Sequence, residues 1–268
     1  MMFSMLLLMF FQAPIHASEY LVYDLSNGQE IRYDGFIEEM NDYQVIFIGD
    51  VHDDKRVHEF QLDVLKSLGR NGVPFVIAME MFQQPFQPYL DAYIDGYIDE
   101  KEMVEHTEYE TRWGFDSSLY APIWRFARQN EINILAINIP TELVSKVREL
   151  GVERVNTDDL PDPIIIPSKE YVSYVEAQFK AHPSTGDLKA FMNVQLAWDN
   201  GMALGICGVL KEFPGKKVVV IVGAGHVYYG LGIPDVLTKL SPGVKDVIVV
   251  PVKELEEKSG DFGISFNK

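Results

Sequence analysis

The chain has 268 residues, of which 47% are hydrophobic and 24% are charged, a balance typical of a globular protein with a sizeable core. Its formal net charge of −17 and its pI of about 4.7 argue against nucleic acid as a partner, because an acidic surface repels phosphate backbones. Cys207 is the only cysteine, so one chain can form neither an intramolecular disulfide nor a cysteine-based metal cluster.

Residues 1–17 have the pattern of a secretory signal. An apolar run at residues 5–11 is too short to span a bilayer, and small residues follow it up to Ala17. We therefore expect export to the periplasm or cell envelope, with cleavage after Ala17 and a mature domain over residues 18–268. Because no Lys or Arg precedes the run, an uncleaved apolar start or a misplaced start codon stays open. No cysteine lies near the cleavage point, so a lipid anchor is not supported.

Strand and helix patterns alternate along the rest of the chain. Asn27-Gly28 predicts a tight hairpin turn within residues 20–33, since both residues tolerate positive φ. Apolar runs predict buried strands at residues 45–48, 75–79, 132–137, 218–222 and, as the last one, 247–250. Helical spacing predicts helices at residues 57–68, 89–106 in two pieces, 118–129, 141–150, 170–181, 187–205 and shortly after Pro234. This alternation predicts a single-domain α/β protein with a mainly parallel sheet flanked by helices.

Polar residues follow three of the predicted strands directly. Gly49-Asp50-Val51-His52 and Gly223-Ala224-Gly225-His226 are two Gly-x-x-His turns, and Glu80 ends another strand. Right-handed crossovers place the carboxyl ends of parallel strands on one edge, where ligands of such sheets bind. We therefore predict that His52, Glu80 and His226 share a pocket suited to acid–base chemistry or to a metal ion. The alternative is that each histidine only hydrogen-bonds a nearby loop and that Glu80 caps a helix.

Four further side chains are candidates for the same pocket. Asp199 lies within the apolar stripe of the predicted helix 187–205, so it is either a structural hydrogen-bond acceptor or a support for a histidine. His58 lies one turn into the first helix, where it either reaches the pocket or packs in the core. Tyr228 and Tyr229 follow His226 directly, and tyrosine can ligate ferric haem. The alternative for both tyrosines is packing of the glycine-rich loop.

These residues together resemble the motifs of the ChaN-like haem-binding uptake family over about residues 40–240. The matching segments, in chain order, are Gly49-x-x-His52 with Asp53, His58 and Gln61, then Met79-Glu80-Met81-Phe82, Asn138-Ile139-Pro140, Gln195-x-x-Trp198-Asp199-x-x-Met202-Ala203, Gly223-x-Gly225-His226-Val227 and Gly232-Ile233-Pro234. Each motif is weak alone, but their order and spacing are specific. The family is part of a wider superfamily that includes TIKI metalloproteases, TraB-like proteins and erythromycin-esterase-like proteins.

The resemblance implies a haem-binding protein of the bacterial cell envelope that acts in haem or iron uptake, with membrane-associated uptake proteins as partners. It implies that a tyrosine holds the haem, for which Tyr228 and Tyr229 are the candidates. His52, His58 and His226 are the further candidates for cofactor binding. Whether the haem site extends across a homodimer stays open.

The wider superfamily implies an alternative function, a metal-dependent hydrolase of small-molecule or peptide substrates. His52, Glu80 and His226 would then hold a divalent metal ion that activates water, and Asp50 or Asp199 would be catalytic by orienting a ligand or accepting a proton. The strand-end pattern fits this alternative better, while the resemblance favours haem.

Two positions depart from the family pattern. Asp50 and Thr141 stand where the family usually has glutamate and arginine. A third interpretation, a binding or structural protein whose site has decayed, therefore stays open.

Overall fold

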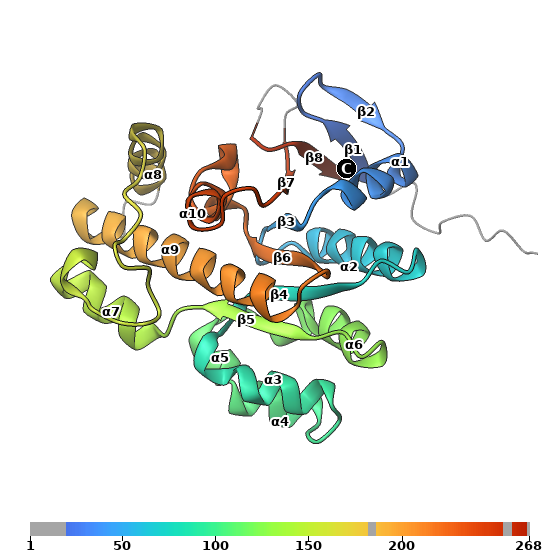
Figure 1. Cartoon of the computed structure of the whole chain (residues 1–268), viewed down its shortest axis with the longest axis horizontal. Helices are drawn as coiled ribbons and strands as arrows, with labels where there is room; N and C mark the ends of the chain where they lie inside the picture. Colours follow the sequence, from blue (N-terminus) through green and yellow to red (C-terminus); the bar gives the residue numbers. More distant parts are fainter. Residues whose placement is uncertain (1–19, 182–185, 254–258, 267–268) are drawn as a thin grey trace, which may run out of the picture.

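A twisted eight-stranded sheet forms the centre of the protein (Figure 1). The computed structural model describes residues 20–181, 186–253 and 259–266. The strand order across the sheet is β2-β1-β8-β7-β3-β6-β4-β5. The bounds are β1 Tyr20–Asp24, β2 Gln29–Ile31, β3 Val45–Asp50, β4 Phe75–Gln83, β5 Ile134–Asn138, β6 Lys217–Gly223, β7 Asp246–Pro251 and β8 Phe262–Phe266.

The strands from β8 to β5 run parallel to their neighbours, whereas β1 pairs antiparallel with both β8 and β2. In the centre of the sheet, β6 lies between β3 and β4. Asp50 at the end of β3 pairs with Gly223 at the end of β6, and Met79 of β4 pairs with Ile221 of β6. Both Gly-x-x-His motifs therefore leave the sheet from adjacent strands, and Glu80 lies on the strand at the other side of β6.

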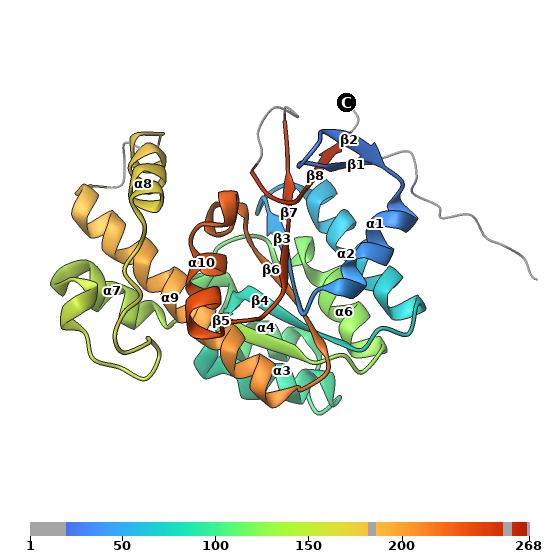
Figure 2. The same ribbon diagram turned by 45° about the horizontal axis from the view of Figure 1, so that its top comes forward.

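Helices cover both faces of the sheet (Figures 1 and 2). One face carries α1, α2 and α6, and the opposite face carries α9 and α10. The bounds are α1 Tyr33–Glu39, α2 Lys55–Arg70, α3 Gln87–Ile94, α4 Glu100–His106, α5 Tyr109–Arg112, α6 Ala121–Gln129, α7 Thr141–Leu150, α8 Lys169–Ala181, α9 Leu188–Glu212 and α10 Ile233–Leu240. Successive strand residues divide between the two layers: Ile46 and Ile48 pack in one core cluster, Val45 and Phe47 in the other.

Most predicted elements are confirmed. The hairpin around Asn27-Gly28 joins β1 to β2, and the predicted buried strands correspond to β3, β4, β5, β6 and β7. α7 has the predicted bounds and ends at Gly151. The second piece of the predicted helix 89–106 is α4, which begins with a capping box: the Asp99 side chain accepts a hydrogen bond from the Glu102 amide, and the Glu102 side chain accepts one from the Asp99 amide.

Three predictions about elements were wrong. β4 continues past Glu80 to Gln83, and α9 continues past Gly205 to Glu212. Gly205 does not end α9 because it serves close packing: a Cβ there would lie 3.1 Å from Gln84 Nε2 and 3.4 Å from the Ile137 carbonyl oxygen. The strand at residues 247–250 is not the last one, because β8 follows it and joins β7 to β1.

The predicted secretory signal at residues 1–17 lies outside the described residues. In the described ranges, none of the helices combines the length and the apolar character needed to cross a membrane.

Candidate functional site

The first Gly-x-x-His turn places His52 against a buried carboxylate. His52 Nδ1 lies 2.7 Å from Asp50 Oδ2, which also accepts a 2.6 Å hydrogen bond from the Tyr120 hydroxyl of α6's N-terminal turn. The other oxygen, Asp50 Oδ1, accepts a 3.0 Å hydrogen bond from Gln61 Nε2. His58 Nε2 also lies 2.9 Å from Asp50 Oδ1, which is ion-pair distance, but its geometry is not that of a hydrogen bond. Asp50 is thus surrounded by His52, His58, Gln61 and Tyr120. Because these neighbours fix the carboxylate, Asp50 in turn orients the His52 imidazole.

The second Gly-x-x-His turn repeats this arrangement from other elements. His226 Nδ1 lies 2.6 Å from Asp199 Oδ1 of α9, and the Tyr171 hydroxyl of α8 donates to Asp199 Oδ2 at 2.5 Å. Each histidine therefore has an aspartate on its Nδ1 side, and each aspartate is held by a tyrosine hydroxyl. In both cases the Nε2 atom is the one left for a ligand.

Glu80 lies where the two imidazoles converge. Its Oε1 is 3.5 Å from His226 Nε2, and its Oε2 accepts a 2.6 Å hydrogen bond from the Gly223 amide. A Cβ on Gly223 would lie 3.3 Å from both Glu80 Oε2 and His52 Nε2. Gly223 thus borders His52 and Glu80 at once, and the predicted meeting of His52, Glu80 and His226 is confirmed by these distances.

The charges at this site favour the ionised form of Asp50 and the imidazolium forms of His52 and His226. Burial raises the pKa of Asp50, but the hydrogen bond from His52 and the nearby His58 imidazole outweigh it and hold that pKa well below its usual range. Burial opposes the charging of His226, yet Asp199 and Glu80 raise its pKa to about 9. For His52, burial is again outweighed by Asp50 and Glu80, and the pKa is raised. His52 and His226 therefore each bind a proton more readily than free imidazole does.

The structure does not present His52, Glu80 and His226 as a ready metal site, and their predicted role as metal ligands stays a prediction. Among the described residues, no group of three or more His, Cys, Asp or Glu side chains has an arrangement that could hold a metal ion. The physical reason lies in the contacts: Glu80 Oε2 is occupied by the Gly223 amide, and Oε1 faces His226 Nε2 at ion-pair distance. As arranged, these donors satisfy one another and do not fit a metal ion.

His58 is buried behind the pocket, with a side chain only 3% exposed. Its ring packs on that of Tyr120 at a centroid distance of 4.2 Å, and its Nε2 faces Asp50. The predicted role of His58 in cofactor binding stays a prediction, and the contact with Asp50 supports a positioning role instead.

Tyr228 and Tyr229 lie beside the second turn and differ in exposure. Tyr228 packs against the apolar cluster beneath α9 and α10, and its hydroxyl donates to the Pro251 carbonyl oxygen at 3.4 Å. Tyr229 is 51% exposed and has a positive φ of 62°, which its amide supports by a 2.7 Å hydrogen bond to the Ser259 carbonyl oxygen. The Tyr229 ring lies edge-on to Tyr174 of α8 at 5.9 Å.

Several residues that border the site were not predicted from the sequence. Trp113 and Phe115 approach the His52 ring at centroid distances of 4.7 and 5.0 Å. Tyr171 reaches Asp199 from a helix whose pattern indicated only packing. None of these residues stands next to a motif in the chain, so only the tertiary fold brings them to the histidines.

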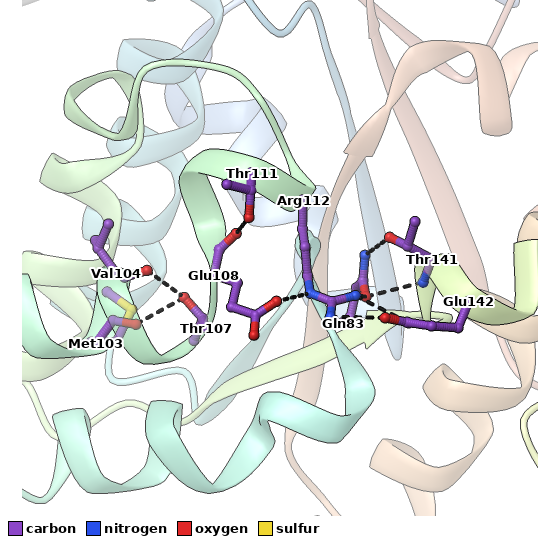
Figure 3. A network of polar contacts seen from close by, with 9 residues as sticks. All are labelled: Gln83, Met103, Val104, Thr107, Glu108, Thr111, Arg112, Thr141 and Glu142. Carbon is purple, nitrogen blue, oxygen red and sulfur yellow. Dashed lines mark hydrogen bonds and ion pairs between the residues drawn. The ribbon is translucent and has the colours of Figure 1, made fainter. Parts of the chain in front are cut away.

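A polar network connects the ends of β4, α5 and α7 near the pocket (Figure 3). Gln83 Nε2 donates to Thr141 Oγ1 at 2.6 Å, while Gln83 Oε1 accepts from the Thr141 amide and from Arg112 Nη1. Arg112 also forms a two-pronged ion pair with Glu142. An arginine guanidinium therefore lies beside Thr141, although Thr141 itself carries no charge.

Comparisons with known proteins agree with this fold. The ChaN of Campylobacter jejuni, in a structure described as cofacial heme binding, superposes with a TM-score of 0.71 at 17% identity, covering 94% of this chain and 98% of that one. An erythromycin esterase, EreC, superposes with a TM-score of 0.50 at 11% identity, covering 87% of this chain and 76% of that one. RRSP, a toxin effector domain from Vibrio vulnificus, superposes with a TM-score of 0.51 at 17% identity, covering 91% of this chain and 38% of that one. At these identities the likeness concerns the fold alone.

No curated protein matches the sequence. A family model does match it, over residues 36–237, which is most of the chain. Its description is haem-binding uptake, Tiki superfamily, ChaN. The chain therefore belongs to the ChaN family of haem-binding uptake proteins within the Tiki superfamily.

Proposed function

We propose that this protein binds haem at the bacterial cell envelope and acts in haem or iron uptake, with Tyr229 as the axial ligand. The proposal is supported by family membership over residues 36–237 and by the likeness to the Campylobacter jejuni protein. The observation that carries it for this chain is the half-exposed Tyr229 phenol, held on a left-handed backbone position beside two other tyrosines. A phenolate is a suitable ligand for ferric haem.

The residues around Tyr229 fit a flat apolar ligand. Tyr174 and Tyr228 offer ring surfaces at centroid distances of 5.9 and 6.1 Å from the Tyr229 ring. Tyr228 is the weaker candidate for iron ligation, because it is packed and its hydroxyl is within hydrogen-bond distance of Pro251. Bound haem would supply an iron centre for storage or transfer, and the protein's own part is to bind it and to exclude water from one face.

A hemin titration of the mature chain tests this proposal. The wild type should give a saturable Soret band with the charge-transfer band of ferric tyrosinate. Tyr229→Phe should lose that charge-transfer band and bind hemin about tenfold more weakly, a difference of ~1.4 kcal/mol. Tyr97, which is 81% exposed in the turn after α3, provides the control, and Tyr97→Phe should bind as the wild type does. Absence of a saturable spectrum in the wild type would overturn haem binding.

The place of action and the partners need separate tests. Fractionation of the native host should recover the protein outside the cytoplasm, and mass spectrometry should find the chain beginning after Ala17. Sedimentation with and without hemin tests a homodimer, and crosslinking in membranes tests uptake partners. Recovery of the intact chain from the cytoplasm would overturn the envelope role and leave haem binding untouched.

A second candidate function is hydrolysis in the pocket of His52, Glu80 and His226, carried by the two His–Asp pairs that face Glu80. Because the donor set does not fit a metal ion as arranged, the mechanism relies on the side chains alone. Glu80 takes a proton from water, and the oxygen attacks an acyl carbon. The His52 and His226 imidazolium ions stabilise the resulting oxyanion, and His226 protonates the leaving alcohol as the C–O bond breaks.

Two variants test the hydrolase. Glu80→Gln keeps the shape of the side chain and its acceptor for the Gly223 amide, but it cannot take a proton. Loss of ester hydrolysis in Glu80→Gln, with unchanged hemin binding, would assign the two activities to separate sites. A wild type without any hydrolysis of simple esters would remove this candidate.

A further inference from the structure

The segment from Thr107 to Tyr120 packs against His52 and its partner Asp50. Trp113 lies edge-on to His52, with an interplanar angle of 73°, and Phe115 packs at the same imidazole. At the end of the segment, Tyr120 donates to Asp50 and so helps to orient His52. We call Trp113 and Phe115 the aromatic wall. The wall gives His52 one apolar, aromatic side, in contrast to the Asp50 carboxylate at its Nδ1 atom.

The wall has one polar group without a partner. Trp113 Nε1 is buried and forms no hydrogen bond to any residue that the structure describes. A buried indole N–H without a partner costs roughly 1–3 kcal/mol relative to a paired one. The Nε1 atom is enclosed by protein, while the Trp113 side chain as a whole stays partly exposed beside His52.

Arg112 ties the segment to the rest of the fold (Figure 3). Its Nη1 donates to Gln83 Oε1 at 2.9 Å, and its Nη1 and Nη2 donate to the Glu142 carboxylate at 3.1 and 3.0 Å. Its Nε donates to Glu108 at 2.8 Å, and its guanidinium carbon lies 4.9 Å from the Phe86 ring centroid. One side chain therefore joins α5 to the end of β4 and to the first turn of α7.

Arg112 differs from an ordinary surface ion pair in its burial. Its side chain is 19% exposed and Gln83 is buried, whereas Arg125 pairs with Glu100 through a side chain that is 57% exposed. Exposed pairs contribute little because water and salt screen them. The buried Gln83 amide gives Arg112 a fixed partner and so a fixed position for Trp113, the next residue.

We propose that the aromatic wall is a specificity site for planar aromatic acyl groups, and that Arg112 is the positioning residue that holds it. This rests on the proposed ligand pocket at His52, Glu80 and His226. In an aryl ester, the ring would pack on Trp113 and Phe115 while the acyl carbon lies near His52 and Glu80. Arg112 touches no ligand and acts only through the position of the wall.

Binding of two product analogues tests the proposal. Benzoate and cyclohexanecarboxylate have the same charge and similar size, but only benzoate is planar. The wild type should bind benzoate about tenfold more tightly, with a change in tryptophan emission that is absent in Trp113→Phe. Arg112→Gln should reduce this preference to about twofold and shift the Trp113 emission to longer wavelength, because the indole becomes more exposed to water.

Controls separate a local effect from loss of fold. Arg125→Gln, which removes the exposed ion pair with Glu100, should keep the full preference. Arg112→Lys, which keeps the charge but not the planar fork, should give an intermediate preference. If Arg112→Gln proves too unstable to study, Gln83→Leu removes the buried acceptor of Arg112 Nη1 and should also weaken the preference.

Equal affinity of the wild type for benzoate and cyclohexanecarboxylate would overturn the proposal. So would a folded Arg112→Gln variant that keeps the wild-type preference for benzoate. Hydrolysis is measured separately with methyl benzoate and methyl cyclohexanecarboxylate. A wild type that binds benzoate selectively but cleaves neither ester would remove the hydrolase and keep the aromatic wall.

Discussion

The Asp199 carboxylate lies 2.6 Å from His226 Nδ1 and holds that imidazole with its Nε2 towards Glu80. Since Asp199 and Glu80 together raise the pKa of His226 to about 9, we expect Asp199→Asn to lower that pKa markedly. NMR titration of the imidazole signals measures the change. Asp50→Asn is the matched control: it should lower the pKa of His52, with which Asp50 pairs, and leave His226 nearly as in the wild type. Equal titration of His226 before and after Asp199→Asn would contradict this assignment.

The same ion pairs make stability depend on pH. His226 has a folded-state pKa of about 9 against an ordinary value of 6.5, so its charged form stabilises the fold fully below pH 6.5 and this contribution is lost as the pH rises through 9. The shift corresponds to about 3 kcal/mol. Urea unfolding of the wild type and His226→Gln should therefore differ most at about pH 6 and least above pH 9.

The central strands and the meeting of His52, Glu80 and His226 could be predicted because the relevant information is local. Buried parallel strands appear as unbroken apolar runs, and topology places their carboxyl ends at one edge. The pairing of Asp50 with Gly223 in the sheet is the direct result. What the pattern could not supply was the direction of each imidazole. That direction depends on Asp50 and Asp199, and it decides against a ready metal site.

The partners of these aspartates could not be predicted, because they come from distant segments. Tyr120 is 70 residues from Asp50 in sequence, and Tyr171 is 28 residues from Asp199. β8 was missed for a related reason. Its Gly263 breaks the apolar pattern, yet the glycine is needed there because a Cβ would lie 2.8 Å from Leu25 and 3.0 Å from Val252.

Two glycines of α9 offer a test of its packing. A Cβ on Gly201 would lie 2.1 Å from Ile139 Cγ2 and 3.2 Å from the Asp159 carbonyl oxygen, so Gly201→Ala requires the backbones to separate. We expect a loss of about 1–3 kcal/mol in the free energy of unfolding. Nothing lies within 4 Å of a Cβ on Gly208, and Gly208→Ala should gain up to about 1 kcal/mol from helix propensity. Thermal or urea unfolding measures both, and a stable Gly201→Ala would contradict the close contact of α9 with Ile139.

A methyl group on Gly223 would lie between His52 and Glu80. It would lie 3.0 Å from His52 Cε1 and 3.3 Å from Glu80 Oε2, on a backbone whose φ of −48° alanine adopts freely. We therefore expect Gly223→Ala to fold with nearly wild-type stability while benzoate binding and any ester hydrolysis fall about tenfold or more, because the space between His52 and Glu80 is filled.

Gly225→Ala is the control for the pocket, two residues further along the same turn. Its methyl group would meet only the Tyr174 hydroxyl oxygen at 3.7 Å, an ordinary van der Waals contact. Ligand binding should therefore be kept in Gly225→Ala. Hemin binding should be kept in Gly223→Ala, since Tyr229 lies outside the space that the new methyl group fills. Unchanged benzoate affinity in Gly223→Ala would mean that the ligand does not occupy the space between His52 and Glu80, and the pocket would have to be sought elsewhere along the sheet edge.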